Sequence, residues 1–141
     1  MSNLRRNRSL VVLAVTFGAT VLVTAGAVVA RAGSGHASTV SVTESEMKIS
    51  AKPTVVDAGK VTFVVRNAGT VEHEMVVIRG GTALKVKGFR VPETASVGEV
   101  GELKAGAIKS VTLNLRPGKY LLICNIPGHY MLGMHSVLTV R

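Results

Sequence analysis

The chain has 141 residues, which suits a single domain once a targeting segment is set aside. Four of its 17 Lys/Arg residues lie before Ser38, so residues 38–141 hold 13 of them against 8 Asp/Glu, a net charge of about +5, with no run of adjacent basic residues. This pattern argues against a nucleic-acid-binding role, and the single cysteine excludes an intramolecular disulfide.

The N-terminal segment has the composition of an export signal. Its first eight residues, MSNLRRNR, carry three arginines and no acid, and the run from Ser9 to Ala30 carries no charge. This apolar run is also long enough to span a membrane as a helix. Small residues typical of cleavage sites occur at 25–27, 30–32 and 35–37. We therefore expect residues 1–37 to be a cleaved signal peptide or a retained N-terminal membrane anchor with its linker. In both cases residues 38–141 form an extracytoplasmic domain, in the periplasm or on the outer face of the cytoplasmic membrane.

From Ser38 onward, short apolar runs rich in β-branched residues alternate with turn residues. This alternation predicts strands over residues 40–42, 47–50, 60–67, 73–81, 109–115, 119–124 and 135–140. The stretch 81–107 is rich in glycine and predicts a long connection between sheets with at most one short strand. Seven or eight short strands at roughly ten-residue spacing predict an all-β protein, a β-sandwich.

Three side chains suited to soft metals cluster near the C-terminus, in the stretch YLLICNIPGHYMLGMHSVLTVR. Strand parity places Cys124 on the core-facing side of the strand over 119–124. The NIPG stretch predicts a tight turn, which carries His129 back over the end of the sandwich, and Met134 begins the final strand. The spacing is C-x4-H-x4-M on a strand–loop–strand corner.

A second histidine, His73, opens the strand after the NAGTVE turn, where it can meet this corner. Two imidazoles, one thiolate and a distant thioether are the ligand set of a type 1 copper site. Each of these residues alone would more often be structural, a buried cysteine or a packed methionine. A zinc site with Cys, two His and water stays open as an alternative, although zinc gains nothing from a thioether. A metal-free interaction module stays open as well.

The stretches NAGTVEHEMVV and PGKYLLICNIPGHYMLGM resemble the cupredoxins, the plastocyanin/azurin-like blue copper family. The resemblance covers residues 39–141 and is strongest to members with a C-x4-H-x4-M loop, of the rusticyanin and sulfocyanin types. It implies a cupredoxin-like Greek-key β-sandwich that holds one copper ion and shuttles single electrons. It also implies that the ligands are His73, Cys124, His129 and Met134.

One position departs from the family pattern. Many cupredoxins have asparagine directly after the first histidine, where it hydrogen-bonds toward the cysteine loop, but here that residue is Glu74. This carboxylate can brace the loop differently, shift the reduction potential or point to solvent. Met75 shares a side of its strand with His73 and is a rival thioether, whereas parity turns His135 away from the metal.

No nucleophile–base motif, phosphate loop or additional histidine cluster is present, so we do not expect an enzyme. The leading prediction is an electron carrier, and the alternative is a protein that delivers, stores or senses copper. We expect a monomer whose redox partner docks near His129, in an apolar patch with Pro127, Tyr130, Met131 and Leu132. His73 should be more deeply covered than His129.

Overall fold

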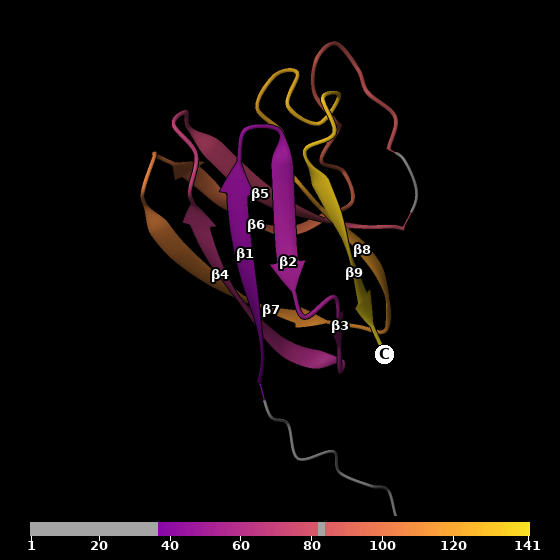
Figure 1. Cartoon of the computed structure of the whole chain (residues 1–141). Helices are drawn as coiled ribbons and strands as arrows, with labels where there is room; N and C mark the ends of the chain where they lie inside the picture. The colour runs from indigo at the N-terminus through magenta and orange to yellow at the C-terminus, as the bar shows by residue number, and fades with distance from the viewer. Residues whose placement is uncertain (1–36, 82–83) are drawn as a thin grey trace, which may run out of the picture. The chain divides into compact units, whose positions relative to one another are not determined.

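A computed structural model describes residues 37–81 and 84–141, and the predicted signal or anchor segment lies outside these residues. The described part forms nine strands (Figure 1). Their bounds are β1 Ser38–Ser45, β2 Lys48–Lys52, β3 Val55–Val56, β4 Gly59–Asn67, β5 His73–Arg79, β6 Ser96–Leu103, β7 Ile108–Leu115, β8 Gly118–Ile123 and β9 His135–Val140. Among the described residues, no helix is long and apolar enough to cross a membrane.

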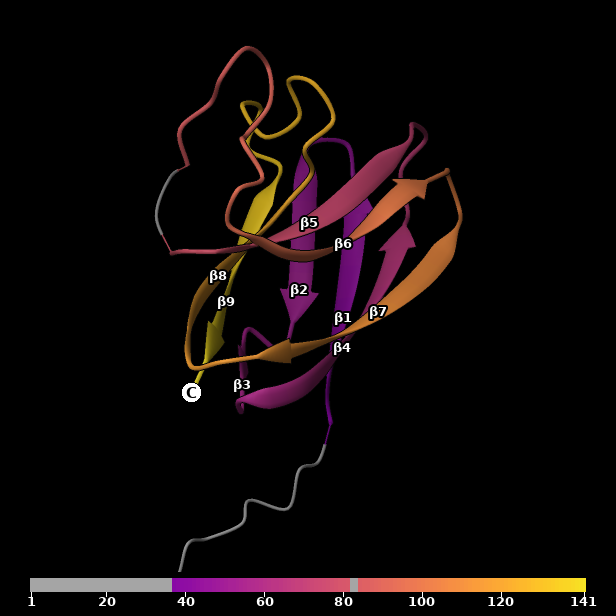
Figure 2. The ribbon, with the colours of Figure 1, turned by 180° about the vertical axis from the view of Figure 1, so that it is seen from behind.

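The strands form two sheets, as predicted for a β-sandwich. One sheet has the order β2-β1-β4-β7 and the other the order β3-β9-β8-β5-β6. The pairs β1–β4 and β3–β9 are parallel, and the remaining pairs are antiparallel. Figure 2 shows the same layers from behind, and the chain crosses between the sheets after β2, β3, β4, β6 and β7.

The main core lies between the two sheets and follows from side-chain alternation. In β4 the buried residues Val61, Phe63 and Val65 alternate with exposed or half-buried ones, because successive side chains of a strand point to opposite faces. In β8, Tyr120 and Leu122 face this same core, as parity predicted. The sandwich therefore buries one face of each strand between the sheets.

A second, smaller core covers the outer face of the five-stranded sheet. Leu121 and Ile123 of β8 are buried there with Val76 and Ile78 of β5, under Val91 from the connection between β5 and β6. This explains why β5 and β8 read as nearly continuous apolar runs instead of alternating ones. The connection is thus a packed part of the fold.

The prediction for residues 81–107 was partly wrong. One strand is present, but β6 spans eight residues and pairs with β5 in the same sheet, so the connection between β5 and β6 does not pass between sheets. The glycines in this strand interrupt the apolar pattern by which a strand is predicted from sequence. At Gly98 an added Cβ would lie 2.4 Å from a methyl carbon of Leu113 on β7, so the close approach of the two strands requires the missing side chain. The two-residue strand β3 was not predicted, and Cys124 and Met134 lie one residue outside β8 and β9.

Candidate metal centre

Three of the four predicted ligands converge at one end of the sandwich. The Cys124 Sγ atom lies 3.3 Å from Nδ1 of His129 and 3.9 Å from Nδ1 of His73. One ligand atom from each of the three residues lies within 4.8 Å of the others. The two imidazole rings meet at an interplanar angle of 64°, with centroids 5.3 Å apart. Two ring nitrogens therefore face one sulfur in a compact, soft donor set.

Strand pairing brings these residues together. His73 is the first residue of β5, and Cys124 directly follows β8, which is the antiparallel neighbour of β5. The loop after Cys124 closes through hydrogen bonds from the His129 N–H to the Ile126 carbonyl, 3.0 Å, and from the Met134 N–H to the His129 carbonyl, 3.1 Å. Gly128 has a φ of 87°, a left-handed conformation that glycine adopts without strain and that places His129 over the site.

The fourth predicted ligand, Met134, is fully buried in the core cluster that contains Cys124. Its carbonyl accepts the Cys124 N–H at 3.1 Å, so the backbone of this methionine is fixed to that of the cysteine. Met75, the rival thioether, is also fully buried in this cluster. Only Met134 is bonded through its backbone to both Cys124 and His129.

The protonation states of the donors fit a metal site. Burial raises the pKa of the Cys124 thiol to about 11, although hydrogen bonds from the backbone N–H groups of Glu74 and Ile126 oppose the rise. Burial, and then the nearby His129 charge, lower the pKa of His73. At neutral pH the site thus offers a neutral imidazole and a thiol that ionises only when a cation compensates its charge.

Glu74, the departure from the family pattern, is half-buried at the start of β5. Its Oε1 atom lies 3.7 Å from Nη1 of Arg90, and the backbone N–H of Asn125 is near enough to favour the charged carboxylate. Burial raises the pKa of Glu74, and the Arg90 charge opposes that rise. The Glu74 side chain therefore does not point freely to solvent, and its contact with Arg90 links β5 to the connection between β5 and β6.

Asn125 is a site-supporting residue that the sequence analysis missed. Its buried amide accepts the Val91 N–H at 2.7 Å, donates to the Val91 carbonyl at 2.9 Å, and donates to the Glu93 carboxylate at 2.6 Å. These bonds tie the residue after Cys124 to the connection between β5 and β6. A polar residue inside the apolar run LLICNIP was the available signal.

Glu44 is a second missed residue. It occupies the inward side of β1 in alternation with Val40 and Val42, and it is fully buried. Among the described residues, neither of its carboxylate oxygens has a hydrogen-bond partner, and the same holds for Nε2 of His73. Burial, and then the charge of Glu74, raise the pKa of Glu44 to about 7.

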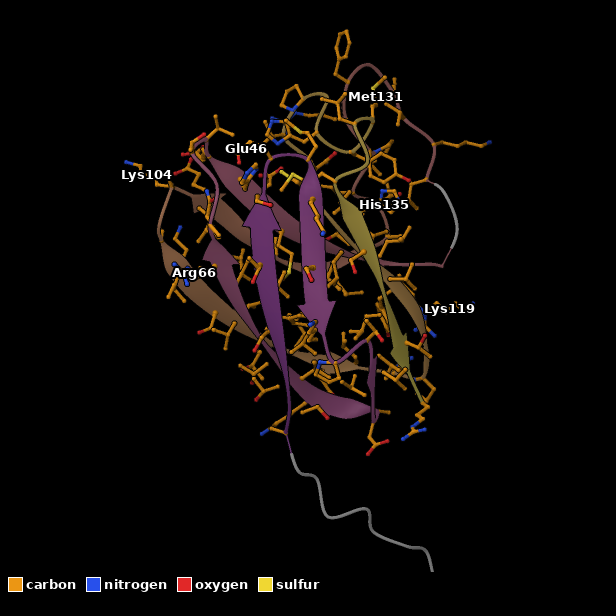
Figure 3. The ribbon with its side chains drawn as sticks, in the orientation of Figure 1. Glu46, Arg66, Lys104, Lys119, Met131 and His135 are labelled. Atoms are coloured by element: carbon orange, nitrogen blue, oxygen red, sulfur yellow. The ribbon has the colours of Figure 1, made fainter. Side chains whose placement is uncertain are left out.

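The outer side of the site is the predicted apolar corner. His129 is half-buried, whereas His73 is fully covered, which confirms their expected order of exposure. Met131 and Leu132 are 57% and 65% exposed, and Figure 3 shows Met131 at this end of the molecule. His135 does not belong to the donor cluster, and its ring packs 5.4 Å from that of Tyr130.

Glu46, in the turn between β1 and β2, holds the segment that leads to His73. Figure 3 labels this glutamate. Its Oε1 atom accepts the N–H of Thr70, the N–H of Val71 at 3.0 Å and the hydroxyl of Thr70 at 3.0 Å. These hydrogen bonds, led by that of the Thr70 N–H, lower the pKa of Glu46 from 4.5 to about 2. The ionised carboxylate therefore stabilises the folded chain.

We expect Glu46→Gln to lower the stability of the metal-free protein at neutral pH. The wild-type contribution is complete above about pH 4.5 and is lost as the pH falls toward 2, because the unfolded chain takes up the proton first. Urea unfolding from pH 2 to 7 should show the two proteins converging at the acid end. Glu99→Gln, an exposed glutamate on β6, is the control. If the free energies of unfolding of the wild type and Glu46→Gln differed by the same amount from pH 2 to 7, the lowered pKa of Glu46 would be wrong.

The sequence model of copper-binding proteins of the plastocyanin/azurin family matches residues 36–141. Auracyanin-B of Chloroflexus aurantiacus is 35% identical over 57% of this chain, and the chain spans 40% of that relative's length. An auracyanin B structure is 28% identical with a TM-score of 0.58, covering 74% of this chain and 89% of the other. Rusticyanin from Thiobacillus ferrooxidans is 17% identical with a TM-score of 0.58, covering 75% and 79%, and this likeness concerns the fold.

Proposed function

This chain belongs to the plastocyanin/azurin family of copper-binding proteins, the cupredoxins, and from that membership we propose that it is an extracytoplasmic carrier of single electrons. The observation that carries the proposal is the buried Cys124 sulfur flanked by Nδ1 of His73 and Nδ1 of His129. We assign these three atoms and the Met134 thioether as the ligands of one type 1 copper ion.

The bound copper ion supplies the one-electron Cu(II)/Cu(I) couple. The chain's own residues hold the donors in place. His73 is fixed by β5 and Cys124 by its backbone bond to Met134, and the hydrogen bonds of Asn125 to Val91 limit movement of the cysteine loop. A donor set that cannot relax much needs little reorganisation when its charge changes, which favours rapid electron transfer. The buried side of the site also keeps bulk water from the sulfur.

The proposal is tested by metal analysis and voltammetry of residues 38–141. We expect one copper ion per chain, an intense visible thiolate-to-Cu(II) band, and a reversible one-electron wave on an electrode. A protein that takes up no Cu(II) and stays colourless without reductant would refute the blue copper assignment.

A role in copper delivery, storage or sensing is the alternative. Exposed Met131 and His135 beside half-buried His129 are the observation that favours it. The full burial of Met134 and the packing of His135 on Tyr130 weaken it, because they reduce the soft donors that a surface site would offer. Rapid loss of copper to a competing chelator, combined with irreversible voltammetry, would favour this alternative over electron transfer.

We further propose export, either as a cleaved protein or as one held at the membrane by residues 1–37. The basic start and the uncharged run from Ser9 to Ala30 support this placement. Mass spectrometry of the protein made in a bacterial host should show cleavage near Ala32 or Ala37, or an intact chain in the membrane fraction. An intact chain found in the cytosol would contradict both forms.

As part of the electron-carrier proposal, we also propose that the protein acts as a monomer and is not an enzyme. Its redox partner docks over the His129 corner, where Met131 and Leu132 form an apolar surface. A small apolar contact permits binding that is specific yet brief. It also excludes water between the two redox centres.

A further inference from the structure

A tight turn beside the metal loop presents an aromatic side chain to solvent. The Lys87 N–H donates to the Arg90 carbonyl at 2.9 Å, which closes a turn with Phe89 at its tip. Gly88 adopts a φ of 66°, which such a turn accommodates without strain. Phe89 is 68% exposed, the largest value among the exposed large hydrophobic residues of the described chain. An aromatic ring at the tip of a closed turn stabilises nothing within the sandwich.

This turn is fixed to the metal loop. The Gly128 N–H donates to the Phe89 carbonyl at 2.9 Å, and Asn125 binds both backbone groups of Val91. The Leu84 N–H donates to the hydroxyl of Tyr130 at 2.8 Å. Figures 1 and 2 both show the β5–β6 connection side by side with the loop between β8 and β9. The backbone of Phe89 therefore has a fixed place beside the loop that carries His129.

The charged side chains within residues 85–90 are all basic. Lys85, Lys87 and Arg90 are exposed. Both nearby acids have partners: the exposed Glu93 accepts a hydrogen bond from the Asn125 amide, and the half-buried Glu74 lies 3.7 Å from Arg90. Within the part of the chain that the structure describes, neither Lys85 nor Lys87 has an ion-pair partner. The basic side chains thus flank the exposed Phe89, on a segment held beside the loop that carries the exposed Leu132.

We propose that residues 85–90 form the second half of the docking surface and select a redox partner with an apolar centre and an acidic rim. The inference rests on the proposed electron-carrier function. Phe89 anchors the contact, because desolvated aromatic side chains contribute strongly to protein interfaces. Lys85 and Lys87 speed the encounter, because complementary charges raise association rates at low salt.

The test measures electron transfer from the copper-loaded protein to two c-type cytochromes, one with an acidic and one with a basic surface. Stopped-flow rates at several ionic strengths should favour the acidic cytochrome and fall as salt rises. The double variant Lys85→Glu/Lys87→Glu should slow this reaction roughly tenfold at low salt and reverse its salt dependence. Lys52→Glu/Lys60→Glu, the same charge change at the far ends of β2 and β4, is the matched control and should have a much smaller effect.

Phe89→Ala should slow electron transfer to the acidic cytochrome at every salt concentration and leave the salt dependence of the rate unchanged. Val55→Ala, an exposed apolar residue on β3, is its control. Equal rates with the two cytochromes would overturn the inference. An effect of the far-end lysine pair as large as that of Lys85 and Lys87 would also overturn it.

Two further readouts separate this inference from the proposed function. The visible band and electrode potential of each variant report the copper site alone and should match the wild type. Binding of the acidic cytochrome to the metal-free protein should shift the backbone amide NMR signals of residues 85–90 and 126–133. If the wild type shows no reversible Cu(II)/Cu(I) wave, the proposed electron-carrier function is wrong. The NMR shifts of the metal-free protein still test the inference, because they show whether the acidic cytochrome binds at residues 85–90. Shifts confined to other residues would refute it.

Discussion

Replacing Cys124 by serine is expected to abolish the visible band of the copper-loaded protein and to remove tight copper binding. The sulfur is the atom that both imidazole nitrogens face, at 3.3 and 3.9 Å, and it alone can supply thiolate-to-copper charge transfer. A serine hydroxyl is nearly isosteric but is a harder, far less acidic donor. Absorption spectra recorded during Cu(II) titration, with metal analysis after gel filtration, measure both effects.

The control for this experiment is Met131→Leu, which removes an exposed soft donor from the same end of the molecule. This variant should keep the band and the copper stoichiometry. Backbone NMR spectra of metal-free Cys124→Ser should match those of the wild type, because the buried thiol mainly fills space in the absence of metal. A blue Cys124→Ser protein would mean that the proposed centre is wrong.

The metal corner was readable from the sequence because its information is local. Parity along YLLIC put Tyr120, Leu122 and Cys124 on one face, and all three lie in the core between the sheets. The place of His73 could also be predicted locally, because it opens a β-branched run in the sequence and is the first residue of β5. Local patterns thus indicated each of the three donors, and the pairing of β5 with β8 brings His73 to Cys124 across 51 positions of sequence.

The residues that support the site were not readable, because their partners are distant in sequence. Asn125 and Val91 are 34 positions apart, and nothing in either segment indicates the other. The strand β6 was underestimated since Gly98 weakens the strand pattern, and its role emerges only from the side chain of Leu113 on β7. The packed connection between β5 and β6 was likewise interpreted as a simple link, and Phe89 was overlooked with it.

The buried carboxyl of Glu44 is another feature that the sequence predicts only in part. The alternation of Glu44 with Val40 and Val42 can be read along β1, but the lack of a hydrogen-bond partner for its carboxylate within the described chain cannot. It lies on the inward face of β1, fully buried, with no hydrogen-bond partner for either oxygen among the described residues. Such a group remains protonated when its charged form would lose the solvation of water. This accounts for a pKa of about 7 in the folded protein against an ordinary value of 4.5.

Glu44→Gln is therefore expected to stabilise the metal-free protein at and above neutral pH. The unfolded chain releases the Glu44 proton near pH 4.5 and the folded chain only near pH 7, so the wild type is most stable below 4.5 and loses stability as the pH rises through 7. The loss relative to the variant should reach about 3 kcal/mol by pH 8, since each pKa unit corresponds to about 1.4 kcal/mol. Urea unfolding at pH 4, 6 and 8 measures it, with Glu99→Gln as the surface control. If the wild type and Glu44→Gln differ by the same amount at all three pH values, Glu44 is not held protonated by the fold.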